Sequence, residues 1–284
     1  MTRPVVLKLG GELLETPQRL DAIVDAIARL TRRAPLVVVH GGGREIDAEL
    51  ARRGVETRVI DGLRVTDAPT LEVVVSTLTR MNARLVSAMC AAGVRAVGMT
   101  GADSGVCDVA PAPLYQAVDG SVVDLGFVGE PIGTARPALI DWLLQGGFTP
   151  AAACIGADAE GRLYNVNGDV FAARLAARLT ARHLIIAGST PGVLDAAGHT
   201  IRTLDAAGAD RMVREGDASA GMVAKLAACL SALEAGVDEV AIVDGRDPEC
   251  LVGAEGTQIV RDATCQATGS GLRASGASGS GTKN

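Results

Sequence analysis

The sequence predicts an α/β fold in which helices cover both faces of a mainly parallel central sheet. Short runs rich in Val, Leu and Ile recur along the chain, and the first two, at residues 5–9 and 36–40, each end at glycines. Between the runs, apolar residues recur at helical spacing. Strands that are apolar throughout and alternate with helices are typical of a parallel sheet buried on both sides. Ligands of such sheets bind beyond the carboxyl ends of the strands.

The same two patterns assign the individual elements in chain order. The expected strands are residues 5–9, 36–40, 96–99, 151–155, 184–187 and 239–243. The expected helices are residues 20–30, 46–50, 69–92, 138–144 and 220–235, with another that begins near Asp169. Residues 101–137 are instead rich in Gly, Pro and Asp, which predicts a hairpin-like excursion over the substrate.

Composition excludes several classes of protein. The chain has 284 residues, of which 48% are hydrophobic and only 2% aromatic, so Val, Leu, Ile and Ala must build its core. A net charge of −6 and few aromatic side chains for base stacking argue against binding of nucleic acid. No apolar run reaches the ~18 residues of a membrane span, and no secretory signal is evident. We therefore expect a cytoplasmic protein that contacts no membrane.

The use of lysine is the sharpest clue to chemistry. Of 27 basic residues only three are lysine, at Lys8, Lys225 and Lys283. The first two lie in apolar surroundings, although a strand inside a sheet rarely carries an unpaired charge. A compact ammonium group differs from a planar guanidinium, and phosphoryl transfer can require the former. The alternative is that these two lysines are there by chance.

Glycines follow the first two predicted strands. Gly10 and Gly11 end one strand, and residues 41–43 end the other, so backbone N–H groups there could approach an anion. Neither cluster matches the dinucleotide fingerprint G-x-G-x-x-G or the phosphate-binding loop G-x-x-x-x-G-K-[ST]. Glycine after a strand is most often only a turn. Together with Lys8, however, the clusters become a candidate phosphate cradle.

Two further segments carry candidate polar groups. Residues 165–169 (NVNGD) precede a helix, so Asp169 is either a helix N-cap or part of the chemistry. Residues 61–67 (DGLRVTD) place Arg64 in a predicted turn, where its guanidinium could bind a carboxylate or simply be solvated.

Five motifs together resemble a known family. They occur in the order seen in the N-acetylglutamate kinases, a branch of the amino-acid kinase family, and the resemblance runs from about residue 4 to residue 260. The motifs are residues 6–11 (VLKLGG), 40–43 (HGGG), 61–67 (DGLRVTD), 165–169 (NVNGD) and 221–225 (GMVAK). Each one alone is unspecific, whereas the ordered set is specific.

The resemblance implies a role for each matching residue. Lys8 and Lys225 would stabilise charge on the transferring phosphoryl group, and Asp169 would hold the two ammonium groups. Arg64 would bind the α-carboxylate of the substrate, and Asn165 would help to fix the acetylated amino acid.

Other matching residues would bind through their backbones. Gly42 and Gly43 would contact the substrate, and Gly10 and Gly11 would contact the nucleotide phosphates. Ser189 and Gly192 would belong to the nucleotide site, although Ser189 stands where the family usually has aspartate. The implied cofactors are ATP and Mg²⁺, with the ion carried by the nucleotide and no metal site formed by the protein.

The resemblance also implies an architecture and an activity. The fold would be the three-layer α/β/α sandwich of carbamate-kinase-like proteins, with residues 1–168 binding N-acetyl-L-glutamate, residues 169–262 binding ATP and residues 263–284 forming a flexible tail. The reaction would phosphorylate the γ-carboxylate of N-acetyl-L-glutamate, a step of arginine biosynthesis. Arginine-inhibited relatives carry an extra N-terminal helix. The first expected strand here already begins at Val5, which leaves no room for such a helix in this sequence, so we expect a homodimer insensitive to arginine.

General chemistry agrees with this assignment. A glutamate side chain has a pKa near ~4.3 and is already an ionised nucleophile at neutral pH, so no general base is required. The reaction instead needs neutralisation of charge, because a carboxylate must approach a polyanion. The histidines are His40, His183 and His199, and we expect a structural role for His40.

Three alternatives remain at this stage. A sister kinase could act on another carboxylate, such as aminoadipate linked to a carrier protein, but such a partner would favour a basic docking face. A catalytically silent amino-acid sensor would not need Lys8, Asp169 and Lys225. A nicotinamide-dependent oxidoreductase would need the glycine fingerprint that is missing here.

Overall fold

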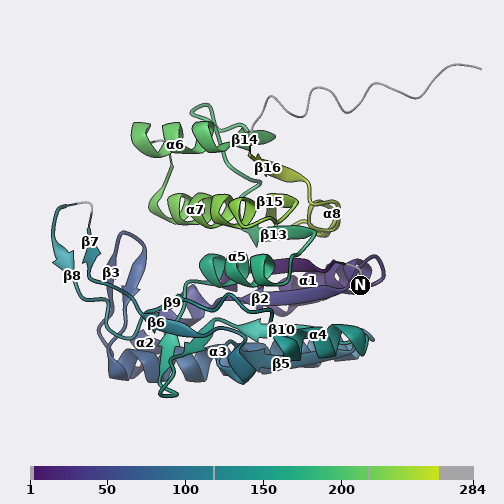
Figure 1. The fold of residues 1–284 in the computed structure, drawn as a ribbon, viewed down its shortest axis with the longest axis horizontal. Helices are drawn as coiled ribbons and strands as arrows, with labels where there is room; N and C mark the ends of the chain where they lie inside the picture. Colours follow the sequence, from purple (N-terminus) through teal and green to yellow (C-terminus); the bar gives the residue numbers. More distant parts are fainter. Residues whose placement is uncertain (1–2, 118, 217, 262–284) are drawn as a thin grey trace, which may run out of the picture.

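The computed structural model describes residues 3–117, 119–216 and 218–261, and an eight-stranded sheet runs through it (Figure 1). The strands lie in the order β14-β16-β15-β13-β1-β2-β10-β5. Their bounds, in chain order, are β1 (Val5–Leu9), β2 (Leu36–His40), β5 (Ala96–Thr100), β10 (Thr149–Ala153), β13 (His183–Gly188), β14 (Thr203–Asp205), β15 (Glu239–Asp244) and β16 (Gly256–Val260). All neighbouring strands are parallel except β15 and β16. The predicted, mainly parallel sheet is confirmed.

Alternate residues of each central strand enter two separate hydrophobic cores. In β1, Val6 belongs to one core and Leu7 and Leu9 to the other, and all three are fully buried. The first core is closed by α4 (Ala138–Gln145), α5 (Gly168–Arg178), α6 (Ala206–Glu215) and α7 (Ala220–Glu234). The second is closed by α1 (Pro17–Thr31), α2 (Gly43–Arg53), α3 (Ala68–Ala91) and α8 (Pro248–Gly253). Helices therefore cover both faces of the sheet, which confirms the three-layer α/β/α sandwich.

The two halves of the chain occupy opposite ends of this sheet. Strands β5, β10, β2 and β1 lie within residues 5–153, and β13, β15, β16 and β14 lie within residues 183–260 (Figure 1). They meet where β1 pairs with β13, with Lys8 beside Ile186. The order of strands reverses at this point, where ligands of open α/β sheets usually bind.

Short hairpins and turns project from the main sheet. The two-stranded pairs are β3 (Arg58–Ile60) with β4 (Leu63–Val65), β6 (Val109–Pro111) with β9 (Gly129–Pro131), β7 (Tyr115–Gln116) with β8 (Val122–Val123), and β11 (Ile155–Ala157) with β12 (Leu163–Asn165). Single 3₁₀ turns, η1 (Gly11–Leu13) and η2 (Asp103–Gly105), follow β1 and β5. The hairpin-like excursion expected at residues 101–137 is therefore present, and its position over a substrate stays a prediction.

Two local predictions were wrong. Residues 151–155 do not form one strand, because the chain leaves the main sheet at Cys154 and Ile155 pairs with Asn165 in the hairpin β11–β12. Arg64 is not in a turn but in the middle of β4, since the turn lies at Asp61 and Gly62, whose φ angles are 48° and 82°.

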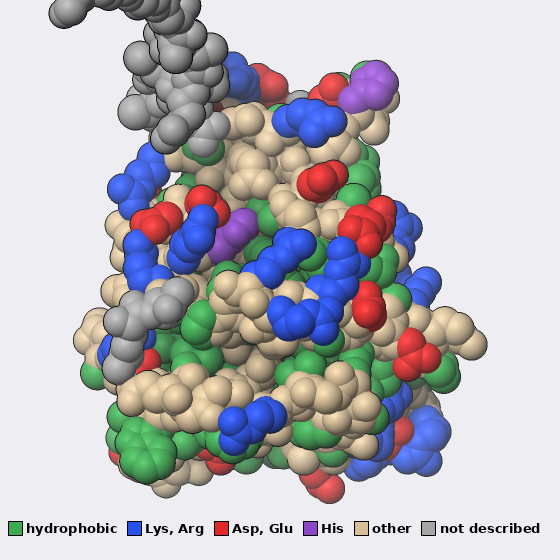
Figure 2. Space-filling model, turned by 90° about the vertical axis from the view of Figure 1, so that its right-hand side faces the viewer, with side chains coloured by type: hydrophobic (Ala, Val, Ile, Leu, Met, Phe, Trp, Pro, Cys, Tyr) green, Lys and Arg blue, Asp and Glu red, His purple; other side chains and the backbone are tan. Residues whose placement is uncertain are grey.

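Four elements of the second half were not predicted: β14, α6, α8 and β16. They are short, and α6 also has Gly208 inside it, which weakens the signal for a helix. The expected flexible tail at residues 263–284 lies outside the described residues. Within the described ranges, no helix has the length and apolar character needed to cross a bilayer. On the face drawn in Figure 2, basic and acidic side chains are interspersed over most of the surface.

Candidate active site

A cavity of about 260 Å³ opens at the carboxyl ends of the central strands. Its walls come from the turns after β1 and β2, from Cys154 after β10, from the hairpin strand β4, and from the segment that leads from β12 into α5. Nine of the predicted site residues line it: Lys8, Gly10, Gly11, Gly42, Gly43, Arg64, Asn165, Asp169 and Lys225. Residues distant in sequence thus meet where parallel strands end, as the fold class predicted.

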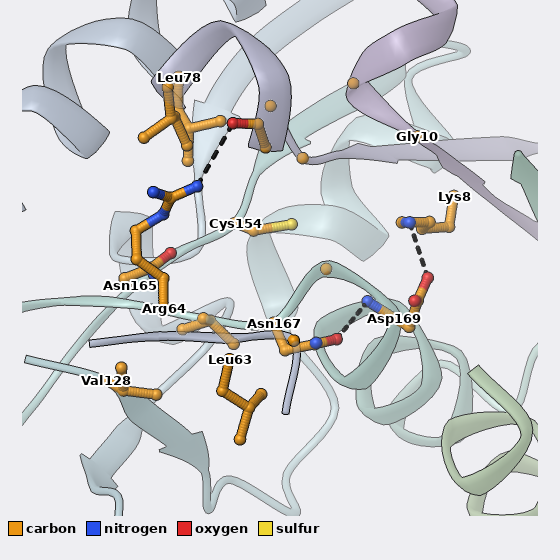
Figure 3. A pocket seen from close by; sticks show the side chains of 18 of the residues that line it. Lys8, Gly10, Leu63, Arg64, Leu78, Val128, Cys154, Asn165, Asn167 and Asp169 are labelled. Carbon is orange, nitrogen blue, oxygen red and sulfur yellow. Dashed lines mark hydrogen bonds and ion pairs between the residues drawn. The ribbon is translucent and has the colours of Figure 1, made fainter. Parts of the chain in front are cut away.

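Lys8 lies inside the sheet with 7% of its surface exposed. Its Nζ is 2.7 Å from Oδ1 of Asp169 (Figure 3). Burial alone would lower the pKa of this ammonium, but the charge of Asp169 and the hydrogen bond to it outweigh burial, so the pKa is raised above its ordinary value. Lys8 is therefore a fixed positive charge at the floor of the cavity.

Asp169 connects the two lysines. Asn167 caps α5 by accepting hydrogen bonds from the backbone N–H groups of Asp169 and Val170, at 2.9 and 3.2 Å, which fixes Asp169 in the first turn of the helix. Its Oδ2 lies 3.5 Å from Nζ of Lys225 on α7. Burial would raise the pKa of this carboxyl, yet the charges of Lys8 and Lys225 prevail and lower it. One carboxylate therefore orients two ammonium groups toward the cavity.

The two glycine turns touch each other directly. A Cβ atom on Gly11 would lie 2.6 Å from Cα of Gly42, and one on Gly42 would lie 2.5 Å from Sδ of Met81. A side chain on Gly11 would force the turns apart, and one on Gly42 would collide with Met81 and Leu78 of α3. Gly41 and Gly43, by contrast, face open space with nothing within 4 Å. Gly43 begins α2, so the unpaired N–H groups and positive dipole end of that helix are available to an anion.

Arg64 forms the opposite wall of the cavity from Lys8 (Figure 3). Its side chain is only 11% exposed, and Nη2 lies 2.6 Å from Oδ1 of Asp47 and donates a hydrogen bond of 3.4 Å to the carbonyl of Gly43. Nη1 is buried without a hydrogen-bond partner in the described structure. Asp47 thus holds the guanidinium by one nitrogen, and the other nitrogen remains for a ligand carboxylate.

Asn165 stands beside Arg64 and presents an amide. Its Nδ2 donates to Oγ1 of Thr66 at 3.3 Å, and its backbone N–H donates to Phe127. Leu63 and Val128 provide apolar surface next to this amide (Figure 3). This end of the cavity therefore combines a guanidinium, an amide and an apolar wall, whereas the Lys8 end is dominated by charge.

Two predicted residues do not line the cavity. Ser189 follows β13 and is half-buried outside the cavity wall, and Gly192 is buried at a φ of 140°, which favours glycine. A Cβ atom on Gly192 would lie 2.6 Å from Oγ1 of Thr257, so steric crowding explains why this position is a glycine. Their assignment to a nucleotide site remains a prediction.

Sequence reasoning missed several lining residues. Leu63, Val128 and Cys154 carry no pattern that marks them. The N-cap of α5 is Asn167 and not Asp169, the residue for which the sequence left a capping role open. Glu12 follows the first glycine pair by one residue, and this proximity was the available signal. His40 is fully buried, which lowers its pKa to about 4, and it does not line the cavity, in line with the structural role expected of it.

The described residues of the site do not form a metal centre by themselves. Across the residues that the structure describes, no three His, Cys, Asp or Glu side chains cluster closely enough to hold a metal ion. A cation in this cavity would need ligands from a bound molecule. A cation carried by nucleotide phosphates meets that requirement.

Comparison with known proteins agrees with this geometry. The model of the amino acid kinase family matches residues 3–244. The chain is 40% identical over 256 residues to the acetylglutamate kinase of Azoarcus sp. (strain BH72), covering 88% of this chain and 84% of that protein. It is 37% identical over 257 residues to the acetylglutamate kinase of Symbiobacterium thermophilum, covering 88% and 87%. The resemblance expected from the ordered motifs is confirmed.

Solved structures share the fold. The N-acetylglutamate synthase of Neisseria gonorrhoeae superimposes with a TM-score of 0.77 at 24% identity, over 92% of this chain but 60% of that one. The carbamate kinase of Giardia superimposes with a TM-score of 0.65 at 14% identity, over 92% and 99% of the two chains. These likenesses show a common architecture, and the matches in sequence show descent. The chain belongs to the amino acid kinase family.

Proposed function

We propose that this protein transfers the γ-phosphoryl group of ATP to the side-chain carboxylate of N-acetyl-L-glutamate, a step of arginine biosynthesis. One observation carries the proposal: a single cavity has two lysines joined by Asp169 at one end, and Arg64 with Asn165 at the other. The named relatives at 36–40% identity support the choice of substrate.

The Arg64 end suits an acetylated amino acid. The unpaired Nη1 of Arg64 would bind the α-carboxylate, and the amide of Asn165 would hydrogen-bond the acetamido group. Leu63 and Val128 would contact the acetyl methyl group. The substrate's own carboxylate would then extend past Gly42 and Gly43 toward the lysines.

The Lys8 end suits phosphoryl transfer. The attacking carboxylate is already ionised, so the protein needs to position it and to neutralise charge. Lys8 and Lys225 would bind the oxygens of the transferring group, while Asp169 keeps both ammonium groups in place. The N–H groups of the turns at Gly11 and Gly43 would add hydrogen bonds to the same oxygens. The acyl phosphate product hydrolyses readily, so water must be kept out.

The nucleotide would enter from the second half of the sheet. We propose that residues 1–168 form the amino-acid lobe and residues 169–262 the nucleotide lobe, with Gly10, Gly11, Ser189 and Gly192 on the nucleotide side. A magnesium ion bound to the nucleotide would neutralise the charge of its phosphates.

We also propose a cytoplasmic homodimer that arginine does not inhibit. Strand β5 is at one edge of the main sheet, with Gly98 exposed on it, and an unpaired edge is available to a second copy. Light scattering tests the dimer, and assays with added arginine test the insensitivity. A hexamer or inhibition by arginine would contradict this proposal.

The decisive experiment traps the product. The protein is incubated with ATP, Mg²⁺ and N-acetyl-L-glutamate in the presence of hydroxylamine, which converts an acyl phosphate to a hydroxamate. Glutamate and N-acetyl-aminoadipate serve as parallel substrates, and Lys8→Arg and Lys225→Arg as variants that conserve charge. We expect hydroxamate from N-acetyl-L-glutamate only, lost in both variants. Product only from the aminoadipate compound would indicate a sister kinase, and no product with any substrate would indicate a silent sensor.

A further inference from the structure

Glu12 is a carboxylate in the cavity that the proposed reaction does not use. It belongs to the turn η1, and its carboxylate fills the space that a side chain on Gly10 would occupy. It also reaches across to the end of β13, where a Cβ atom on Gly188 would lie 3.7 Å from Oε1 of Glu12 and 4.0 Å from Cε of Lys225. Glu12 and Lys225 thus converge on the point where the two halves of the sheet meet.

Glu12 differs from the other acidic residue that lines the cavity. Asp169 is 6% exposed and is engaged by Lys8 and Lys225. The carboxylate of Glu12 is half-buried, and in the part of the chain that the structure describes it makes no hydrogen bond or ion pair. Its two oxygens are therefore free to coordinate or accept from a ligand.

The charges at this end of the cavity explain why such a carboxylate matters. Lys8 and Lys225 supply two positive charges, and Asp169 and Glu12 supply two negative ones. The transfer end is therefore electrically neutral before any ligand binds. A polyphosphate that enters without a cation would face Glu12 directly, and like charges at close range repel strongly in a partly desolvated site.

A divalent cation reverses the sign of this interaction. Mg²⁺ in nucleotide sites is held by substrate phosphates together with one or two carboxylates, often through water. Glu12 is an unpaired carboxylate beside the two lysines, in a region with no complete metal centre of its own among the described residues. We propose that Glu12 is the side chain through which this protein contacts the cation of the nucleotide, and that it thereby discriminates against nucleotide without metal. This inference rests on the proposed ATP-dependent transfer.

The neighbouring Ser189 fits this assignment. It directly follows Gly188 and has a hydroxyl group but no charge. The carboxylate that reaches the end of β13 thus comes from the turn after β1, in the other half of the chain. Glu12 therefore links the amino-acid side of the cavity to the nucleotide side.

The test measures binding of ADP and of a non-hydrolysable ATP analogue by calorimetry, with excess MgCl₂ and with excess EDTA. The quantity compared is the Kd without metal divided by the Kd with metal. In Glu12→Gln we expect this ratio to fall about tenfold or more, because metal-free nucleotide no longer meets a negative charge. Glu15→Gln is the matched control, because Glu15 lies three residues further on, pairs with Arg19 and Arg44, and does not line the cavity.

Each outcome decides the question. A ratio that falls in Glu12→Gln but not in Glu15→Gln supports the inference, and a changed electron paramagnetic resonance spectrum of bound Mn²⁺–ADP in Glu12→Gln alone would support it independently. An unchanged ratio, or an equal fall in both variants, overturns it. The two proposals can fail separately. If the wild-type protein forms hydroxamate but Glu12→Gln has the same Kd ratio as the wild type, the inference about Glu12 is wrong and the proposed function still holds. Wild-type protein that binds no nucleotide would defeat both.

Discussion

The Nζ of Lys8 lies 2.7 Å from Oδ1 of Asp169, and their side chains are only 9% and 8% exposed. Burying two charges costs several kcal/mol per ion, so such a pair is a poor means of stabilising a fold. Replacement by well-packed apolar residues is often neutral or better for stability. The ion pair is therefore best explained by a role in the site, because it orients the ammonium group of Lys8 toward the cavity.

Removing the carboxylate of this pair should damage both stability and activity. Asp169→Asn would leave two ammonium groups, one of them deeply buried, without their counter-charge, and we expect a loss of about 3 kcal/mol in the free energy of unfolding. Urea titration measures it, and the hydroxamate assay should show almost no product. The control is Asp238→Asn, which breaks the exposed pair with Arg3 and should cost about 1 kcal/mol or less. Equal losses in the two variants would contradict the argument.

The difference in the free energy of unfolding between wild type and Asp169→Asn should depend on pH, and the direction of this dependence follows from the pKa of Asp169. The pKa of Asp169 is lowered in the folded protein, so its contribution is complete above the unfolded value near ~3.9 and is lost as the pH falls through the folded pKa. We therefore expect the stability gap between wild type and Asp169→Asn to be constant around neutral pH and to shrink below about pH 4. A gap that widens on acidification would refute this.

His40 should make the protein sensitive to milder acid. Burial lowers its pKa from 6.5 to about 4, so the unfolded chain binds a proton in this range while the folded chain does not. Stability from this residue is full above pH 6.5 and falls as the pH drops toward 4, by roughly 3 kcal/mol in total. Urea titrations between pH 4 and pH 6.5 measure the free energy of unfolding. Its slope against pH should be smaller for His40→Asn than for the wild type, whatever the stability of the variant at neutral pH. Identical slopes would exclude His40 as the cause.

The pair of Arg64 and Asp47 should govern substrate binding. Asp47→Asn removes the anion 2.6 Å from Nη2, so the guanidinium loses its fixed orientation. We expect KM for N-acetyl-L-glutamate to rise roughly tenfold with little change in kcat, because the loss affects binding in the ground state and transition state equally. Steady-state kinetics of Asp47→Asn measure this, with Asp25→Asn as the control, since Asp25 lies only near Arg29 on the surface. A fall in kcat with KM unchanged would contradict the positioning role.

The contact between the glycine turns should be intolerant of a methyl group. Gly11→Ala would place Cβ about 2.6 Å from Cα of Gly42, so the turns must separate, with a cost of ~1–3 kcal/mol and a large fall in kcat. Gly41→Ala is the control for stability only, because nothing lies within 4 Å of its Cβ position but Gly41 itself lines the cavity. Thermal unfolding measures the stability of both variants, and the hydroxamate assay measures the activity of Gly11→Ala. Equal thermal stability of the two variants would show that the contact is dispensable for the fold.

Local pattern was enough to predict most of the architecture. The aliphatic runs at β1, β2, β13 and β15 and the apolar spacing of α3 depend only on residues close in sequence, and these elements lie within about two residues of their expected ends. Pattern failed at Cys154, because pairing of Ile155 with Asn165 in the hairpin β11–β12 takes the chain out of the main sheet there. It failed again at Arg64, because pairing of β3 with β4, and not composition, makes that residue part of a strand.

The same limit applies to the candidate site: some of its features could be predicted from the sequence, and others depended on the tertiary structure. By itself the sequence determined which residue types were available: scarce lysines, paired glycines, and a capped helix at Asp169. Only the tertiary structure decided that Asp169 lies between Lys8 and Lys225, that Glu12 lines the cavity, and that Ser189 and Gly192 do not. The physical reason is that these distances depend on the order and register of parallel strands. That order arises from packing two hydrophobic cores over the whole chain, and no short segment of sequence carries it.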